Sequence, residues 1–122
     1  MEEVRGRMLE DIILLETAKT LDKKRYRVFK LKFERGEFDM VIYDRQDNCC
    51  EIYEIKHSDQ IVEEQARHLR DSDKCMRAQR RFGEIAKKCV LYLGCETEMG
   101  EVLYYNAESF LKELPGFCGK KY

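Results

Sequence analysis

The sequence predicts an α/β domain built around one mixed central sheet. Three observations lead to this prediction: apolar residues at helical spacing near the N-terminus, short strand patterns in the middle, and further helical patterns between the later strands. The expected order of elements is α-β-β-β-α-α-β-β-α, which is typical of α/β architecture. Because 122 residues is the length of one typical domain, we expect a single domain over residues 1–122.

The first half of the chain predicts one helix followed by three strands. The helix has an apolar stripe at the spacing i, i+4, i+8 and i+11, and the strands concentrate aromatic and β-branched residues between polar turns. The stripe consists of Val4, Met8, Ile12 and Leu15, widened by Leu9, Ile13 and Ala18. The expected ranges are 3–20 for the helix and 25–33, 37–44 and 49–57 for the strands.

The second half predicts two helical stretches, two strands and a short last helix. Ser58 or Asp59 is a suitable N-cap for the first stretch, and the pair Pro115-Gly116 ends the last helix. The two strands are expected to flank a hairpin loop. The expected ranges are 58–69 and 71–86 for the helical stretches, 88–95 and 102–105 for the strands, 96–100 for the loop and 106–114 for the last helix.

Composition excludes several classes of protein. The formal net charge of −1 argues against a uniformly basic surface of the kind used for non-specific nucleic-acid binding. No stretch has the ~20 apolar residues of a membrane span and no secretory signal begins the chain, so we expect a cytoplasmic protein without a membrane partner. The six cysteines form no C-x-x-C pair, which favours reduced, structural cysteines.

Two carboxylates and one lysine are expected to converge on the hairpin of the second and third strands. If the four-residue loop after Asp44 closes this hairpin, Asp44 pairs with Cys49. Counting back along both strands then places Asp39 opposite Glu54, with side chains on one face and Cβ atoms ~5 Å apart. Lys56 shares that face, because it lies two residues beyond Glu54.

Such a group suits a divalent metal ion. Two carboxylates this close repel each other unless a cation lies between them, and hard oxygen ligands select Mg²⁺ or Mn²⁺. The carbonyl of Ile55 could add a ligand, and Lys56 could position or deprotonate a metal-bound water. Glu10, at the edge of the helical stripe, could supply another metal ligand or a base that orients water. This set of residues suits hydrolysis of a phosphodiester bond.

Simpler interpretations remain open for each of these features. Acidic residues followed by x-Lys also occur at Asp22, in a polar turn, and a surface Glu-Lys cross-strand pair contributes only ~0.2–1 kcal/mol. Residues 67–88 carry eight Lys or Arg against three Asp or Glu. That segment is either a solvated helix face or a phosphate-binding surface beside the site. The nucleic-acid-binding candidates in it are Arg67, Arg70, Arg77, Arg80 and Arg81.

The pattern of Gly36-x-x-Asp39 and Glu54-x-Lys56, behind a helix with Glu10, resembles the PD-(D/E)XK nuclease superfamily. The segments Arg-Gly-Arg-Met-Leu-Glu-Asp, Gly-Glu-Phe-Asp and Tyr-Glu-Ile-Lys-His-Ser are most similar to the nuclease-like C-terminal domain of prokaryotic AAA-type ATPases.

The resemblance implies a restriction-endonuclease-like core, α-β-β-β-α-β, over residues 3–94. It implies that Asp39 and Glu54 bind the metal, that Lys56 assists the attacking water, and that Glu10 supports the metal. Gln65 lies where some of these nucleases carry a glutamine that contacts substrate or water, although a solvated helix glutamine is the simpler interpretation. Phe38 departs from the family pattern, which has Pro before the Asp.

Two hypotheses of different classes follow. The first is a Mg²⁺- or Mn²⁺-dependent nuclease that acts on DNA. The second is a non-catalytic nucleic-acid-binding or assembly module of an AAA-type ATPase, and since the chain has no P-loop, it would be a fragment or a stand-alone copy. A third interpretation is an unrelated α/β protein in which the acidic-lysine pattern is accidental. The sequence leaves the oligomeric state open, a homo-oligomer included.

Overall fold

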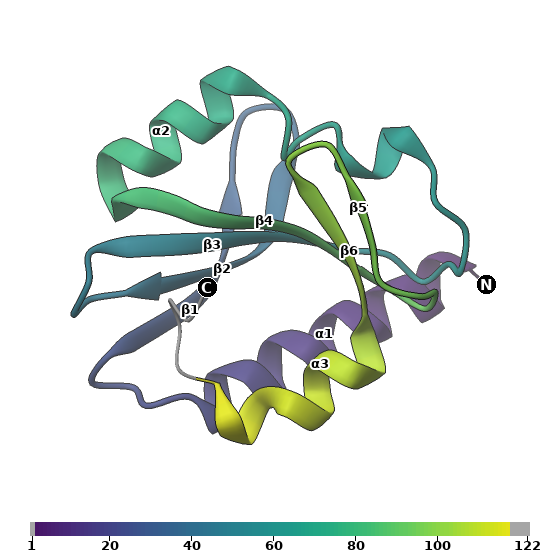
Figure 1. The fold of residues 1–122 in the computed structure, drawn as a ribbon, viewed down its shortest axis with the longest axis horizontal. Coiled ribbons are helices and arrows are strands. Elements are labelled where there is room, and N and C mark those ends of the chain that lie inside the picture. The colour runs from purple at the N-terminus through teal and green to yellow at the C-terminus, as the bar shows by residue number, and fades with distance from the viewer. Residues whose placement is uncertain (1, 118–122) are drawn as a thin grey trace.

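One six-stranded mixed sheet, in the order β1-β2-β3-β4-β6-β5, runs through the protein (Figure 1). The computed structural model describes the backbone of residues 2–117 and the side chains of residues 6–117. The α-helices are α1 (Glu2–Thr20), α2 (Ser72–Phe82) and α3 (Ala107–Glu113), and 3₁₀ turns span Glu63–Ala66 and Leu114–Gly116. The strands are β1 (Tyr26–Lys32), β2 (Glu37–Asp44), β3 (Cys49–Ile55), β4 (Glu84–Tyr92), β5 (Thr97–Met99) and β6 (Val102–Asn106).

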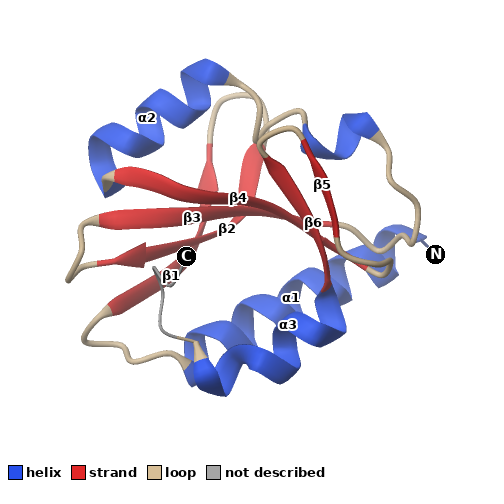
Figure 2. Cartoon of the chain, viewed as in Figure 1, coloured by secondary structure: helices blue, strands red, loops and turns tan. Residues whose placement is uncertain are grey.

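The helices cover the sheet from both sides (Figure 2). Helices α1 and α3 lie side by side on one face, where Ile13, Tyr53 and Phe110 belong to one apolar cluster. Helix α2 lies on the opposite face, where Phe38 and Ile52 belong to a second cluster. The predicted α/β class with one mixed sheet is therefore confirmed.

The expected register of the β2–β3 hairpin is confirmed from the loop to Met40. Asp44 pairs with Cys49 and Met40 pairs with Tyr53 in an antiparallel ladder. Asn48 adopts a positive φ of 50° in the connecting loop, a conformation that Asn tolerates better than most residues. The Asp44 carboxylate accepts two hydrogen bonds from Arg25, at 3.0 and 2.9 Å, which fixes the strand next to the turn.

The core-facing side of α1 differs from the expected stripe. Ile13 is fully buried, whereas Met8, Ile12 and Leu15 are 57%, 46% and 67% exposed. Apolar residues lie on several sides of this helix, so spacing alone does not select the buried side. Packing against the sheet buries the side that contains Ile13 and Thr17.

The two helical stretches predicted between β3 and β4 are shorter in the structure than expected. Only Glu63–Ala66 is helical within 58–69, as a 3₁₀ turn. Tertiary hydrogen bonds hold this segment to the later strands: Leu93 N–H donates to the Ser58 carbonyl, and Tyr104 Oη donates to the Val62 carbonyl.

The helix expected over 71–86 ends at Phe82. Gly83 follows with a φ of +80° and donates its N–H to the Gln79 carbonyl, which closes the last turn of α2. Strand β4 therefore begins at Glu84, four residues before the expected Lys88.

The hairpin expected between strands 88–95 and 102–105 is also wrong. β4 pairs with β6 in parallel, and β6 pairs with β5 in an antiparallel hairpin. The segment 96–100, expected to be a loop, thus contains strand β5. A three-residue strand without an apolar pattern gives little sequence signal.

Two further expectations concern cysteines and membranes. Within the part of the chain that the structure describes, the cysteines are free, with Cys95 exposed and the others buried. Cys118 lies outside the described residues. No described helix combines the length and apolar character needed to cross a membrane.

Candidate metal-binding cleft

Asp39 and Glu54 meet where the β2–β3 ladder ends. Met40 and Tyr53 form the last regular pair. Beyond it, the Asp39 N–H donates to the Glu54 carboxylate at 3.3 Å, and the Ile55 N–H donates to the Asp39 carboxylate at 2.8 Å. Side chains thus replace the next rungs of the ladder, and the structure brings together the two carboxylates that the sequence predicted as neighbours.

A β-bulge in the β1–β2 ladder determines on which face of the sheet Asp39 lies. Between the pairs Phe29–Val41 and Leu31–Phe38, two residues of β2 lie opposite the single residue Lys30 of β1. The two are Asp39 and Met40. Because the bulge resets the alternation, Phe38 and Val41 belong to the cluster under α2, while Met40 belongs to the cluster under α1 and α3.

The expectation that Asp39 and Glu54 share one flat face of the sheet is therefore wrong. In β2, alternation through the bulge places Asp39 on the face covered by α1, together with Glu37. In β3, alternation places Glu54 on the face covered by α2, together with Ile52. The two residues start from opposite faces, and their carboxylates converge because each reaches across the end of the ladder.

Three carboxylates form a cluster on the α1 side of this junction. Glu10 of α1 and Glu37 and Asp39 of β2 each place a carboxylate oxygen within 4.8 Å of the others. Lys30 forms ion pairs with Glu10 and, at 3.8 Å, with Glu37. One Glu37 oxygen is buried and has no hydrogen-bond partner among the described residues. Sequence reasoning predicted Glu10 and Asp39 but missed Glu37, whose position two residues before Asp39 on the same strand was the available signal.

Lys56 lies on the other side of Asp39. Its ammonium is 3.6 Å from the Glu54 carboxylate, and its side chain is 37% exposed while that of Glu54 is 2% exposed. The backbone N–H of Lys56 donates to the Leu91 carbonyl, which fixes this residue to β4 just beyond the end of β3. Lys56 therefore has an anchored backbone and a solvent-accessible ammonium.

An open cleft of about 520 Å³ joins these groups. Four of the five predicted catalytic and metal-binding residues line it, together with Gln65; the four are Glu10, Asp39, Ile55 and Lys56. Glu54 lies behind this surface. The cleft also includes residues that sequence reasoning did not select, namely Gly6, Arg7, Glu37, His57 and Ser58. Ser58, expected to cap a helix, accepts a hydrogen bond from the Gln60 N–H in a turn.

The buried carboxylates hold protons more tightly than usual. Burial, together with the charge of Asp39, raises the pKa of Glu54 to about 8 against the opposing effects of Lys56 and of the hydrogen bond from the Asp39 N–H. Burial likewise raises the pKa of Asp39 to about 6, against the opposing hydrogen bond from Ile55. Close oxygen donors with raised pKa values suit a divalent cation, which would take the place of the protons.

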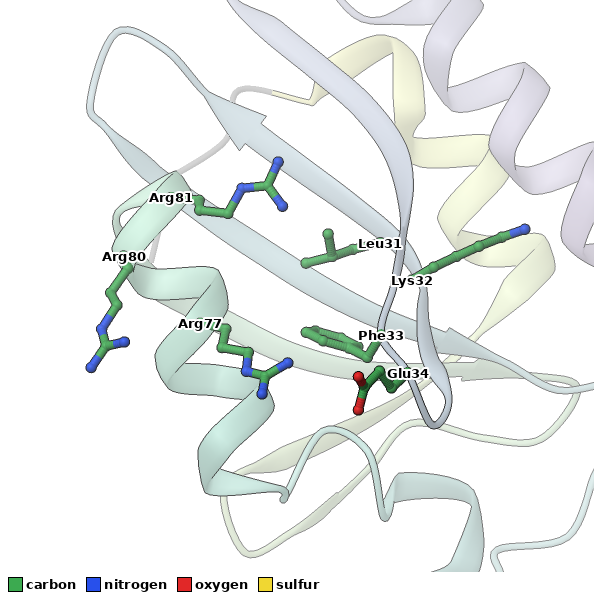
Figure 3. Close-up of a pocket in the computed structure, with 7 residues that line it drawn as sticks. All are labelled: Leu31, Lys32, Phe33, Glu34, Arg77, Arg80 and Arg81. Atoms are coloured by element: carbon green, nitrogen blue, oxygen red, sulfur yellow. The ribbon is translucent and has the colours of Figure 1, made fainter.

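The predicted arginines do not line this cleft. Arg67 pairs with Glu64 at 3.1 Å, and Arg70 donates to the Met99 carbonyl at 2.8 Å near the β5–β6 hairpin. The other three, Arg77, Arg80 and Arg81, line a separate groove between α2 and the end of β1 (Figure 3). Only Gln65 of the nucleic-acid-binding candidates lies in the cleft, and its side chain accepts a hydrogen bond from the Val62 N–H.

Comparison of the chain with family models, with curated proteins and with solved structures gives no match. The function of this cleft is therefore argued from its own geometry.

Proposed function

We propose that this protein is a metal-dependent nuclease that hydrolyses phosphodiester bonds of DNA with a PD-(D/E)XK-type site. One observation carries the proposal: at an open cleft, Asp39 donates its backbone N–H to Glu54 and places its own carboxylate in a cluster with those of Glu10 and Glu37. Lys56 pairs with Glu54 at the same cleft.

The residues that line the cleft, with Glu54 behind them, fit Mg²⁺ or Mn²⁺. Asp39, Glu54 and Glu10, with the Ile55 carbonyl, are all oxygen donors, as these ions require. When bound, the metal would polarise the phosphodiester and lower the pKa of a water molecule. Lys56, with an ammonium that is partly exposed beside Glu54, would orient that water or stabilise charge on the phosphate.

The order of elements also supports the proposal. Helix α1 precedes three antiparallel strands, and α2 then crosses over to β4, which is parallel to β3. This arrangement accommodates the α-β-β-β-α-β core that the family resemblance implies. It places Asp39 and Glu54 on neighbouring strands and Glu10 on the helix beside them.

Cleavage of DNA tests this proposal directly. Linear, nicked and branched DNA would be incubated with Mg²⁺ or Mn²⁺ and with wild-type protein, Asp39→Ala or Lys56→Ala. We expect cleavage by the wild type and loss of at least about 100-fold in rate for either variant. Glu108→Ala and Lys112→Ala, exposed positions on α3, are the matched controls. Absence of cleavage on every substrate, or equal cleavage by the two site variants, would refute the enzymatic function.

A second candidate is a non-catalytic nucleic-acid-binding or assembly module, attached to an AAA-type ATPase. The exposed apolar residues Met8, Ile12 and Leu15 on α1 favour it, because such a face is typical of protein contacts. Lys30 also provides charge to the acidic cluster without a metal. Calorimetric titration with Mn²⁺ separates the candidates: a nuclease site binds the ion and loses it in Glu54→Ala, whereas no binding by the wild type favours the module.

A further inference from the structure

A groove with a volume of about 380 Å³ lies between α2 and the end of β1 (Figure 3). We call it the arginine groove. Leu31 and Phe33 form its apolar floor, and the guanidinium groups of Arg77 and Arg81 point into the space beside them (Figure 3). Arg80 lies at the rim and points outward (Figure 3). The groove therefore combines an apolar surface with cationic walls.

The arginines of this groove retain most of their capacity to bind an anion. Arg77 pairs with Asp73 at 3.2 Å, but both side chains are more than half exposed, so this pair is weak. Among the described residues, Arg81 forms no ion pair and stacks only on the Phe82 ring, 4.9 Å from its centroid. Glu34 is the single acidic residue that lines the groove.

The aromatic ring of Phe33 in the floor limits the classes of ligand that suit the arginine groove. The Phe33 ring contacts Phe38 edge-on, with centroids 5.1 Å apart, so it is held in place while it lines the groove. A fixed aromatic ring in a groove that is also lined by guanidinium groups suits a ligand with planar apolar rings and regularly spaced negative charges. Unpaired nucleotides have both features, whereas the bases of a duplex are stacked inside it. An acidic peptide offers the charges without the rings.

The arginine groove and the metal-binding cleft flank the same hairpin. Lys32 lines the groove, and its cross-strand partner Glu37 lines the cleft. Paired residues have Cα atoms only ~5 Å apart. The Lys32 side chain points away from α2 (Figure 3), and β1 is the edge strand of the sheet, so no further strand separates the two cavities. A ligand strand can therefore pass around this edge from one cavity to the other.

We infer that the arginine groove binds an unpaired nucleic-acid segment adjacent to the phosphodiester bond in the cleft. The substrate class is then nucleic acid with an unpaired strand next to the cut: a single strand, a flap or a splayed end. The identity of the substrate rests on the proposed function of the cleft, but binding in the groove needs no metal and can be measured separately.

Fluorescence anisotropy in EDTA tests the inference without catalysis. The probes are a labelled oligothymidine of about 12 nucleotides and a blunt duplex of the same length. We expect tighter binding of the single strand and a rise of at least about 10-fold in its Kd for the double variant Arg77→Gln/Arg81→Gln. Phe33→Leu keeps an apolar side chain but removes the ring, and should raise the Kd of the single strand about 5-fold while leaving that of the duplex unchanged.

The matched control is Lys24→Gln/Lys112→Gln, which removes the same charge at exposed positions outside the groove. Its Kd should change less than about 3-fold. Circular dichroism and a thermal melt would show that each variant is folded. Equal losses in the groove and control variants would overturn the inference. Equal affinity of the wild type for single strand and duplex, or preferential binding of poly-glutamate in the groove, would overturn it as well.

Cleavage assays then separate this inference from the proposed function. Groove-dependent binding without any cleavage would uphold the groove and refute the nuclease. Cleavage that depends on Asp39 and Lys56 but is equal on blunt and single-stranded DNA, with no effect of the groove variants, would uphold the nuclease and refute the groove.

Discussion

Asp39 is linked to Glu54 and to the residue after it by two hydrogen bonds: the Asp39 N–H donates to the Glu54 carboxylate at 3.3 Å, and the Ile55 N–H donates to the Asp39 carboxylate at 2.8 Å. These two hydrogen bonds close the end of the β2–β3 ladder with carboxyl side chains. Both carboxyl groups are buried, and the charge of Asp39 raises the cost of ionising Glu54. The site is thus built at the expense of stability, as functional sites often are.

We expect Glu54→Gln to stabilise the metal-free protein at pH 8. The glutamine retains an oxygen that can accept from the Asp39 N–H, and it removes a buried charge that burial and Asp39 both disfavour. The free energy of unfolding should rise by roughly 1–4 kcal/mol, as measured by urea denaturation in EDTA. Glu98→Gln, at an exposed position of β5, is the control and should change stability by less than about 0.5 kcal/mol. A less stable Glu54→Gln would contradict this account.

The stability of the metal-free protein should fall as the pH rises. The folded state holds the Glu54 proton up to about pH 8, whereas an unfolded glutamate loses it near pH 4.5. Over that interval the folded state binds more protons than the unfolded state, so the contribution to stability is complete below the lower pKa and is lost as the pH approaches the higher one.

Subtracting the unfolding free energies of Glu54→Gln from those of the wild type isolates this contribution from other titrating groups, such as His68. We expect the difference to change steadily between pH 5 and 8. Added Mg²⁺ should stabilise the wild type most at the alkaline end, because deprotonated carboxylates bind the ion. A flat difference profile would show that Glu54 is not buried as a protonated acid.

Lys30→Gln should make the protein dependent on a divalent cation. Lys30 pairs with both Glu10 and Glu37, and its removal leaves the three clustered carboxylates without this cation. In EDTA, we expect the free energy of unfolding of Lys30→Gln to be about 1–3 kcal/mol lower than that of the wild type. Mn²⁺ should raise the free energy of unfolding of this variant by more than it raises that of the wild type. Lys19→Gln removes an exposed i,i+3 pair with Glu16 on α1 and serves as the control. An equal Mn²⁺ response in Lys30→Gln and wild type would argue against metal binding by the cluster.

Gly36→Ala and Gly6→Ala should have opposite effects on stability. Gly36 has a φ of +91°, and a Cβ there would overlap the His68 ring, so alanine should destabilise by about 1–3 kcal/mol. Gly6 lies within α1, where a Cβ meets nothing within 4 Å, so alanine should stabilise by about 0.5–1 kcal/mol. Thermal unfolding measures both changes. In a double-mutant cycle, His68→Ala should relieve only the overlap part of the Gly36→Ala effect, because the backbone strain remains.

The sequence by itself determined the α/β class, the β2–β3 hairpin and the proximity of Asp39, Glu54 and Lys56. These features depend on local information: a four-residue loop sets the pairing, which brings Asp39 and Glu54 to the same end of the hairpin, and Lys56 follows Glu54 by two residues. The sequence also predicted that Glu10 lies near the site, because the first helix was expected to pack on the sheet with Glu10 at the edge of its apolar stripe.

Only the tertiary structure decided which side of α1 is buried, where the chain between β3 and α2 runs, and that β6 inserts beside β4 in parallel. It also decided, through the bulge opposite Lys30, that Asp39 turns to the α1 side and joins Glu37. These outcomes depend on competition among contacts distant in sequence, since several apolar faces and several strand partners satisfy the local rules equally well. The arginines illustrate the same limit, because residues from one basic segment of the sequence lie in three separate places in the structure. Arg67 pairs with Glu64, Arg70 lies near the β5–β6 hairpin, and the other arginines line the arginine groove.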